Sequence, residues 1–104
     1  REHLQRLIKH FRDGAAGLAL PMMDSETAIQ PLLVGEESQA IAISKGLEAE
    51  GVLVSAIRPP TVAAGQSRLR ITLSAAHSEA DIDRLLDALN KVVPAALRVA
   101  PRVL

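Results

Sequence analysis

The sequence predicts an α+β fold in which a small three-stranded, mostly antiparallel sheet has helices packed on one face. Helix-like and strand-like hydrophobic patterns follow one another along the 104 residues in the order α-β-α-β-β-α. Strands separated by a helix favour a right-handed parallel crossover, whereas strands joined by a loop favour an antiparallel pair. A sheet with its third strand in the middle satisfies both rules, and this arrangement is related to the split βαβ unit.

The first predicted helix carries apolar residues at the spacing of one helical face, and we expect Gly14 and Gly17 to end it. Residues 27–34, "TAIQPLLV", follow as the first strand. Pro31 predicts an edge strand or a bulge there, because proline donates no ladder hydrogen bond. The apolar face of the helix consists of Leu4, Leu7, Ile8 and Phe11.

The second predicted helix opens with Glu36 and Glu37, whose carboxylates complement the positive end of the helix dipole. It stops at Gly51, a residue suited to the left-handed position beyond a helix end. The second and third strands are predicted at residues 52–57, "VLVSAI", and 68–73, "RLRITL". The residues of this helix that we expect to point inward are Ala40, Ile43 and Leu47.

The last predicted helix begins at Ser78, with Asp81 placed to complete a variant of the capping box. Pro94 ends this helix. We therefore expect residues 1–93 to form one domain and residues 94–104 to be an irregular, poorly fixed tail. The apolar stripe of the helix adds four residues to the core, namely Ile82, Leu85, Leu86 and Leu89.

Composition restricts the classes of partner. Twelve Lys and Arg residues balance twelve Asp and Glu residues, and Phe11 is the single Phe, Tyr or Trp. Nucleic acid is therefore not an expected partner, because phosphate-backbone binding needs excess positive charge and single strands favour aromatic stacking. The absence of cysteine excludes thiolate metal sites and fits a cytoplasmic protein. No apolar run approaches the ~20 residues of a membrane span, so we expect no membrane association.

The link between the second and third strands, residues 58–67, is longer than most hairpin loops, and longer connections are more often functional. Pro59 and Pro60 fix two φ angles at its start, which predicts a stiff entry into the loop. Thr61 is the first residue after the two prolines and carries a hydroxyl group. The loop is therefore suited to hold a polar group in one place.

Arg68 and Arg70 lie two residues apart on the third strand, so both point to the same face of the sheet. Two like charges on one face repel each other unless water screens them or an anion lies nearby. One interpretation is a solvated sheet face; the other is a guanidinium that binds a carboxylate or phosphate with its planar fork. The opposite face takes the apolar residues of the strand, Leu69, Ile71 and Leu73.

Three stretches of the chain, "AIQPLLVG", "VSAIRPPTV" and "AGQSRLRITLSAAHSEADIDRLLDAL", together resemble the C-terminal small domain of the α-oxoamine synthases. These are pyridoxal-phosphate enzymes of the aminotransferase-like fold, fold type I. The resemblance covers about residues 1–92, and "IRPPTV" followed by G-x-x-RLR is its most specific part. Ala63 departs from the family pattern, which has a third proline there; this change loosens the loop without removing a functional group.

The resemblance implies roles for two residues. Arg70 would bind the carboxylate of the amino-acid substrate, and Thr61 would donate its hydroxyl to the phosphate of pyridoxal 5'-phosphate across the interface of a homodimer. Arg58 and Arg68 would be structural or surface charges. The Schiff-base lysine of the family lies in an upstream domain, which would bind most of the cofactor. This chain would then contain no catalytic residue and would be inactive alone.

The reaction implied by the closest motifs in the family condenses L-alanine with a pimeloyl thioester, either pimeloyl-CoA or a pimeloyl-carrier protein. Carbon dioxide is lost, and the product enters biotin synthesis. The chain begins without Met and inside a helical pattern, so we expect it to be a piece of a longer acyltransferase of this kind.

Other interpretations are weaker. A non-catalytic, small-ligand-binding module of split βαβ type would have a self-contained start and end, and a structural dimerisation domain would have a convincing apolar stripe outside the core. Three lysines in predicted helices, Lys9, Lys45 and Lys91, read as solvated charges.

No metal site is predicted from the histidines. His3 and His10 are expected at the surface, because a metal pair would have closer spacing and a carboxylate partner. His77, near a helix start, is expected to make local hydrogen bonds.

Overall fold

The structure, a computed structural model, describes residues 1–99. Its elements follow the predicted order, and the described chain has no helix that is both long and apolar enough to cross a membrane. The helices and strands are α1 (Glu2–Gly17), β1 (Ile29–Gly35), α2 (Glu37–Ala49), β2 (Ser55–Ile57), β3 (Ser67–Thr72) and α3 (Glu79–Val92), followed by one 3-10 turn, η1 (Ala95–Leu97).

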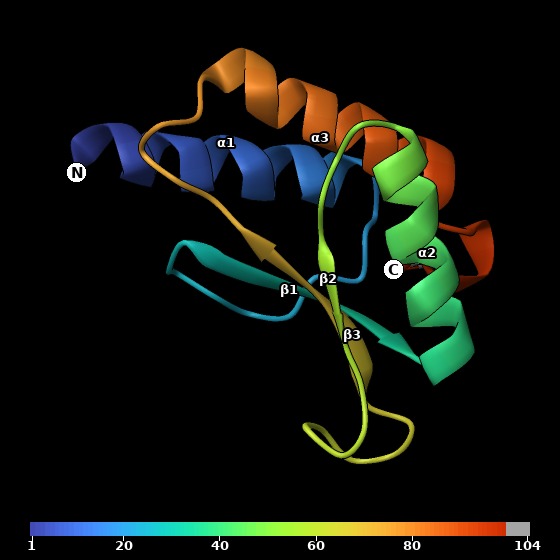
Figure 1. The fold of residues 1–104 in the computed structure, drawn as a ribbon. Coiled ribbons are helices and arrows are strands. Elements are labelled where there is room, and N and C mark those ends of the chain that lie inside the picture. Colours follow the sequence, from blue (N-terminus) through green and yellow to red (C-terminus); the bar gives the residue numbers. More distant parts are fainter. Residues whose placement is uncertain (100–104) are drawn as a thin grey trace, which may run out of the picture.

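The three strands form one sheet in the order β1-β3-β2, and both neighbouring pairs are antiparallel. The strands β1 and β2 are therefore parallel to each other and are separated by β3, as the split βαβ prediction requires. Figure 1 shows the helices on one side of this sheet, with α1 and α3 side by side. The predicted fold class is confirmed in its architecture.

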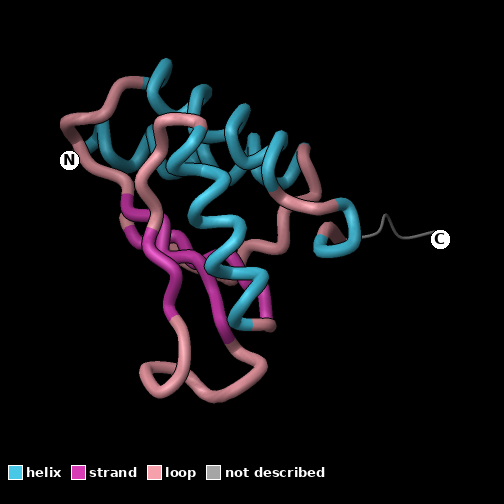
Figure 2. The backbone as a smooth tube through the Cα atoms, turned by 45° about the vertical axis from the view of Figure 1, so that its right-hand side comes forward, coloured by secondary structure: helices cyan, strands magenta, loops and turns pink. Residues whose placement is uncertain are grey.

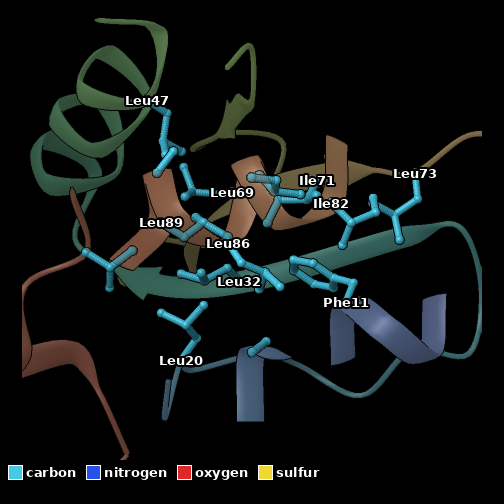
Figure 3. Close-up of a cluster of buried hydrophobic side chains, with 14 of the residues drawn as sticks. Phe11, Leu20, Leu32, Leu47, Leu69, Ile71, Leu73, Ile82, Leu86 and Leu89 are labelled. Carbon is cyan, nitrogen blue, oxygen red and sulfur yellow. The ribbon is translucent and has the colours of Figure 1, made fainter. Parts of the chain in front are cut away.

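The hydrophobic core lies between the sheet and the helices, and Figure 3 shows side chains from both layers meeting there. Alternate residues of β3 point into it, because successive side chains of a strand face opposite sides. Phe11 of α1 is 0% exposed and lies among aliphatic side chains. The inward residues predicted for α2 and α3 are all buried, namely Ala40, Ile43, Leu47, Ile82, Leu85, Leu86 and Leu89.

The helices α1 and α3 run in the same direction and contact each other closely (Figure 1). Gly14 lies inside α1 and does not end it, so that part of the prediction is wrong. The glycine instead makes room for Leu86 of α3, whose side chain occupies the place where a Cβ would be. Gly46 of α2 does the same for Val92, because a Cβ there would lie 2.7 Å from Cγ1 of Val92.

Neither edge strand pairs with β3 along its whole predicted length in a regular ladder. Pro31 lies on edge strand β1, as predicted, and a bulge interrupts the register between Leu33 and Gly35. β2 is shorter than the predicted strand, because residues 52–54 bond to α2 instead of β3: the Val52 N–H donates to a helix carbonyl and the Val54 carbonyl accepts from the hydroxyl of Ser44.

The helix α3 begins at the predicted cap, and the segment that follows it is bonded to the helices. Ser78 and Asp81 form the expected capping box, and the helix stops two residues before Pro94. Beyond the helix, the Arg98 guanidinium donates to the carbonyl of Asn90 in α3, to that of Val93 directly after it, and to that of Leu18. The remainder of the predicted tail, residues 100–104, lies outside the described residues.

Candidate functional site

Within residues 1–99, one face of the sheet carries no helix, and we call it the bare face (Figure 1). Cross-strand register places Arg70 between Pro31 of β1 and Ser55 of β2 on this face, and the next row consists of Leu33, Arg68 and Ile57. Leu33 is 36% exposed, and the isoleucine that begins β1 is 38% exposed. The bare face therefore combines exposed aliphatic side chains with two guanidinium groups.

The two arginines of the bare face differ in their contacts. Nε of Arg68 donates to the carbonyl of Gln66 at 3.0 Å, and its Nη1 lies 3.5 Å from the Met23 sulfur. Arg70 is exposed, and its guanidinium makes no hydrogen bond or ion pair with any residue between 1 and 99. Of the two, Arg70 is the one whose donors are available to an external carboxylate or phosphate.

Thr61 lies in the loop between β2 and β3, residues 58–66, which we call the Thr61 loop. Figures 1 and 2 show this loop extending beyond the sheet and away from the helices. Its residues include a cis Pro59–Pro60 peptide bond, and Thr61 itself is exposed. Within the described chain no hydrogen bond involves the Thr61 hydroxyl, so this group is available to a ligand.

Arg70 and Thr61 are carried by the same hairpin, but no hydrogen bond links them within residues 1–99. A cavity of about 550 Å³ is lined by neither residue. It lies between residues 50–54, the end of β3 and the first turns of α3. The two candidate residues thus lie on the open surface of the domain, where a further protein surface would be needed to enclose a ligand.

Arg58 is an ion-pair partner of Glu37 across 3.8 Å, which agrees with its predicted structural role. Lys9 and Lys91 are exposed and pair with carboxylates in or beside their helices, and Lys45 is exposed on α2. The lysines are therefore solvated charges, as predicted.

Each of the three histidines makes a hydrogen bond with another residue of the described chain. Nδ1 of His77 accepts from the Ser74 N–H at 3.0 Å, which confirms its local role, and Nε2 of His3 donates to the His77 carbonyl at 2.8 Å. Nε2 of His10 lies 2.6 Å from the Asp83 carboxylate. This hydrogen bond raises the pKa of His10, while partial burial opposes the rise. No group of three potential metal ligands occurs among the described residues.

One buried polar network was not predicted. Gln30 of β1 is 0% exposed; its carbonyl oxygen accepts from Nη1 of Arg12 at 2.6 Å, and its amide donates to the carbonyl of Thr27 at 2.7 Å. The same two side chains also donate to the carbonyls of Met23 and Ser25, in the segment that precedes β1. The signal was present in the sequence, because Gln30 shares the inward face of its strand with Leu32.

Comparison with known families gives the class of protein. The model of the family "aminotransferase class I and II" matches residues 1–89, and the chain therefore belongs to this family. The predicted resemblance to pyridoxal-phosphate enzymes is thereby confirmed.

The curated relatives are more specific. The chain is 60% identical over 94 residues to 8-amino-7-oxononanoate synthase of Ectopseudomonas mendocina (strain ymp), which covers 90% of this chain and 24% of the relative. It is 58% identical over 91 residues to the protein of that name from Marinobacter nauticus, covering 88% and 23%. The chain thus spans about a quarter of the length of the curated relatives it matches.

Solved structures show the same fold. The chain matches 8-amino-7-oxononanoate synthase of Francisella tularensis with a TM-score of 0.73 at 24% identity, covering 88% of this chain and 26% of that one. It matches the serine palmitoyltransferase of Sphingomonas wittichii with a TM-score of 0.82 at 26% identity, covering 88% and 24%. The predicted fold, that of a small domain in pyridoxal-phosphate enzymes of fold type I, is confirmed.

Proposed function

We propose that this chain is the C-terminal small domain, residues 1–93 with a short tail, of an 8-amino-7-oxononanoate synthase. The whole enzyme would be a homodimeric acyltransferase that condenses L-alanine with a pimeloyl thioester and releases carbon dioxide. The observation that carries the proposal is Arg70: an exposed guanidinium without a partner in the described chain, in a sequence 60% identical to a synthase of that name.

Arg70 would bind the carboxylate of L-alanine. Its planar fork of donors matches a carboxylate in two parallel hydrogen bonds. Arg70 lies on β3, the middle strand, whose backbone is flanked by β1 and β2. A fixed carboxylate fixes the orientation of the alanine Cα bonds, and such positioning lowers the barrier of the reaction. The arginine also keeps the carboxylate in place until it leaves as carbon dioxide.

Thr61 would bind the phosphate of pyridoxal 5'-phosphate. Its exposed hydroxyl has no partner within residues 1–99, and the Thr61 loop extends away from the domain, as a contact with a second subunit requires (Figure 2). A hydroxyl for a phosphate and a guanidinium for a carboxylate fit the donors that such a cofactor and substrate need. When bound, the cofactor supplies an electron sink for the negative charge that develops at the substrate Cα.

A hybrid enzyme tests the proposal. In it, this chain replaces the matching C-terminal segment of the Ectopseudomonas mendocina synthase, so that the upstream part supplies the remaining residues. We expect release of free CoA from pimeloyl-CoA that depends on both L-alanine and pyridoxal phosphate. The unmodified relative is the positive control, and its upstream part alone is the negative control. A folded hybrid that binds the cofactor and releases no CoA would contradict the proposal.

A further inference from the structure

Both limbs of the Thr61 loop lie beside one short segment, Gly35–Glu37, which we call the β1–α2 corner. At the outgoing limb, Nη1 of Arg58 lies 3.8 Å from Oε2 of Glu37. At the returning limb, the carbonyl oxygen of Gly65 lies 3.5 Å from the position that a Cβ on Gly35 would occupy. Two residues of this three-residue segment, Gly35 and Glu37, therefore lie beside loop positions that are seven apart in the sequence.

The backbone of the corner has a shape that favours glycine. Gly35 has a φ of 98°, in the region that side chains rarely adopt. It pairs with Ser67, the first residue of β3, immediately after the bulge in β1. The corner is thus bent at the point where the loop returns to the sheet, and a Cβ at Gly35 would lie within van der Waals contact of the Gly65 carbonyl.

The two adjacent carboxylates of the corner have different partners. Glu37, in the first turn of α2, faces the arginine at the start of the loop. Glu36 accepts a hydrogen bond from the hydroxyl of Ser38 and makes no ion pair within the described chain. One carboxylate therefore contacts the loop, and its neighbour provides a matched control of the same charge and chemistry.

Bonds inside the Thr61 loop hold it weakly. The N–H of Val62 donates to the Arg58 carbonyl at 3.4 Å, close to the limit of a hydrogen bond, and the N–H of Gln66 donates to the Ala63 carbonyl at 3.0 Å. Figure 2 shows the loop extending beyond the strands that carry it. Its direction relative to the sheet therefore depends on the contacts at its limbs.

We infer that the β1–α2 corner is a positioning element for Thr61, in which Glu37 and Gly35 hold the two limbs so that the threonine hydroxyl is presented to the cofactor phosphate. The inference rests on the proposed function, in which Thr61 binds that phosphate. Neither corner residue touches the cofactor; each acts through the loop. The ion pair is about half exposed at both ends, 47% and 48%, so its effect is modest.

Two pairs of variants in the hybrid enzyme separate this role from general stability. Glu37→Gln removes the charge that faces the loop, and Glu36→Gln removes the neighbouring charge. Gly35→Ala imposes backbone strain, at a φ of 98°, with its new methyl group in ordinary van der Waals contact with the loop. Gly51→Ala imposes similar strain, at a φ of 86°, where no described residue lies within 4 Å of the new methyl group. Thr61→Ala serves as the reference for loss of the hydroxyl itself.

Two readouts are needed. Spectroscopic titration of the apo-hybrid gives the pyridoxal-phosphate concentration for half-saturation, and hydrogen exchange by mass spectrometry reports the order of residues 58–66. We expect Glu37→Gln to raise the half-saturating concentration about two- to fivefold. Gly35→Ala should raise it further, and both variants should speed exchange in the loop. Glu36→Gln and Gly51→Ala are the controls. Each should change either quantity by at most half as much as the variant it is paired with, Glu37→Gln or Gly35→Ala.

The outcomes distinguish two failures. If Thr61→Ala weakens cofactor binding but Glu37→Gln and Gly35→Ala match their controls, the corner is not a positioning element and the proposed function stands. If Thr61→Ala leaves cofactor binding unchanged, the phosphate role of Thr61 is wrong and the inference about the corner fails with it. Faster loop exchange without weaker cofactor binding would also overturn the inference.

Discussion

The two faces of the sheet are built from alternating residues of the same strands, yet they differ in what they contact. On β3, Leu69 is 0% exposed and lies among other aliphatic side chains, whereas its neighbour Arg70 is exposed on the bare face. On the covered face, stability depends on volume and shape. On the bare face, the proposed role depends on one guanidinium group, that of Arg70, which nothing in the described chain engages. By simple alternation, one strand thus carries core residues and the arginine that we propose binds the substrate.

The largest expected effect tests the covered face. Leu69→Ala removes a fully buried side chain and should lower the free energy of unfolding by about 2–5 kcal/mol, because a cavity remains in the core. Arg70→Ala, one residue away, should change it by less than about 0.5 kcal/mol. Urea unfolding of the chain measures both. Similar losses from the two variants would break the distinction between the faces.

The second effect tests the bare face through function. In the hybrid enzyme, Arg70→Ala should lower kcat/KM for L-alanine about 10- to 100-fold, because a charge-assisted hydrogen-bond pair is lost. Arg70→Lys keeps the charge but not the fork and should lose less. The half-saturating concentration of pyridoxal phosphate should stay the same. If Arg70→Ala saturates with L-alanine as the wild type does, the proposed role of Arg70 in binding the substrate carboxylate is wrong.

A smaller effect concerns the helix that follows β3. Ser78→Ala should lower the free energy of unfolding by about 1 kcal/mol, because the serine side chain accepts from the Asp81 N–H at 3.1 Å in the capping box. Glu36→Ala, at the start of α2, provides a comparison, because that residue makes no side-chain cap. Thermal unfolding of both variants would show whether the covering layer depends on its caps as well as on its apolar faces.

The smallest effect tests whether charge matters on the covered side too. Folding raises the pKa of His10 from its ordinary value of 6.5, chiefly through the hydrogen bond to Asp83. The protonated form therefore stabilises the fold fully below 6.5, and this contribution is lost as pH rises through the folded-state pKa. The difference in unfolding free energy between the wild type and His10→Gln should shrink above pH 6.5. If the difference in unfolding free energy between the two proteins does not depend on pH, protonated His10 does not stabilise the fold.

The parts of the fold that hydrophobic periodicity controls could be predicted from the sequence. Four apolar residues of α3 recur at helical spacing, and all are buried; β3 alternates as expected, and its central position follows from rules of strand connection. Arg70 and Thr61 could be singled out because they lie in specific motifs. Their exposure on the open surface agrees with the roles proposed for them.

The features that escaped prediction depend on contacts between segments distant in sequence. Gly14 has the appearance of a helix terminator, but its neighbour across the helix interface, Leu86, lies 72 positions away and cannot be identified by local pattern. The local sequence pattern explains Glu37 only through the helix dipole, whereas its carboxylate also pairs with Arg58. Arg98 is held by carbonyls near the ends of two helices, which composition alone does not reveal.

The close approach of α3 to the two glycine-bearing helices has a consequence for protein engineering. Replacing a helical glycine by alanine is a standard way to stabilise a protein, worth up to about 1 kcal/mol. In this domain the method should fail at Gly14 and Gly46, where α3 already occupies the space that the new methyl group needs. Gly17, with no described residue within 4 Å of a new Cβ, is the site to choose. At the other two positions, a designer would have to shrink Leu86 or Val92 in the same step.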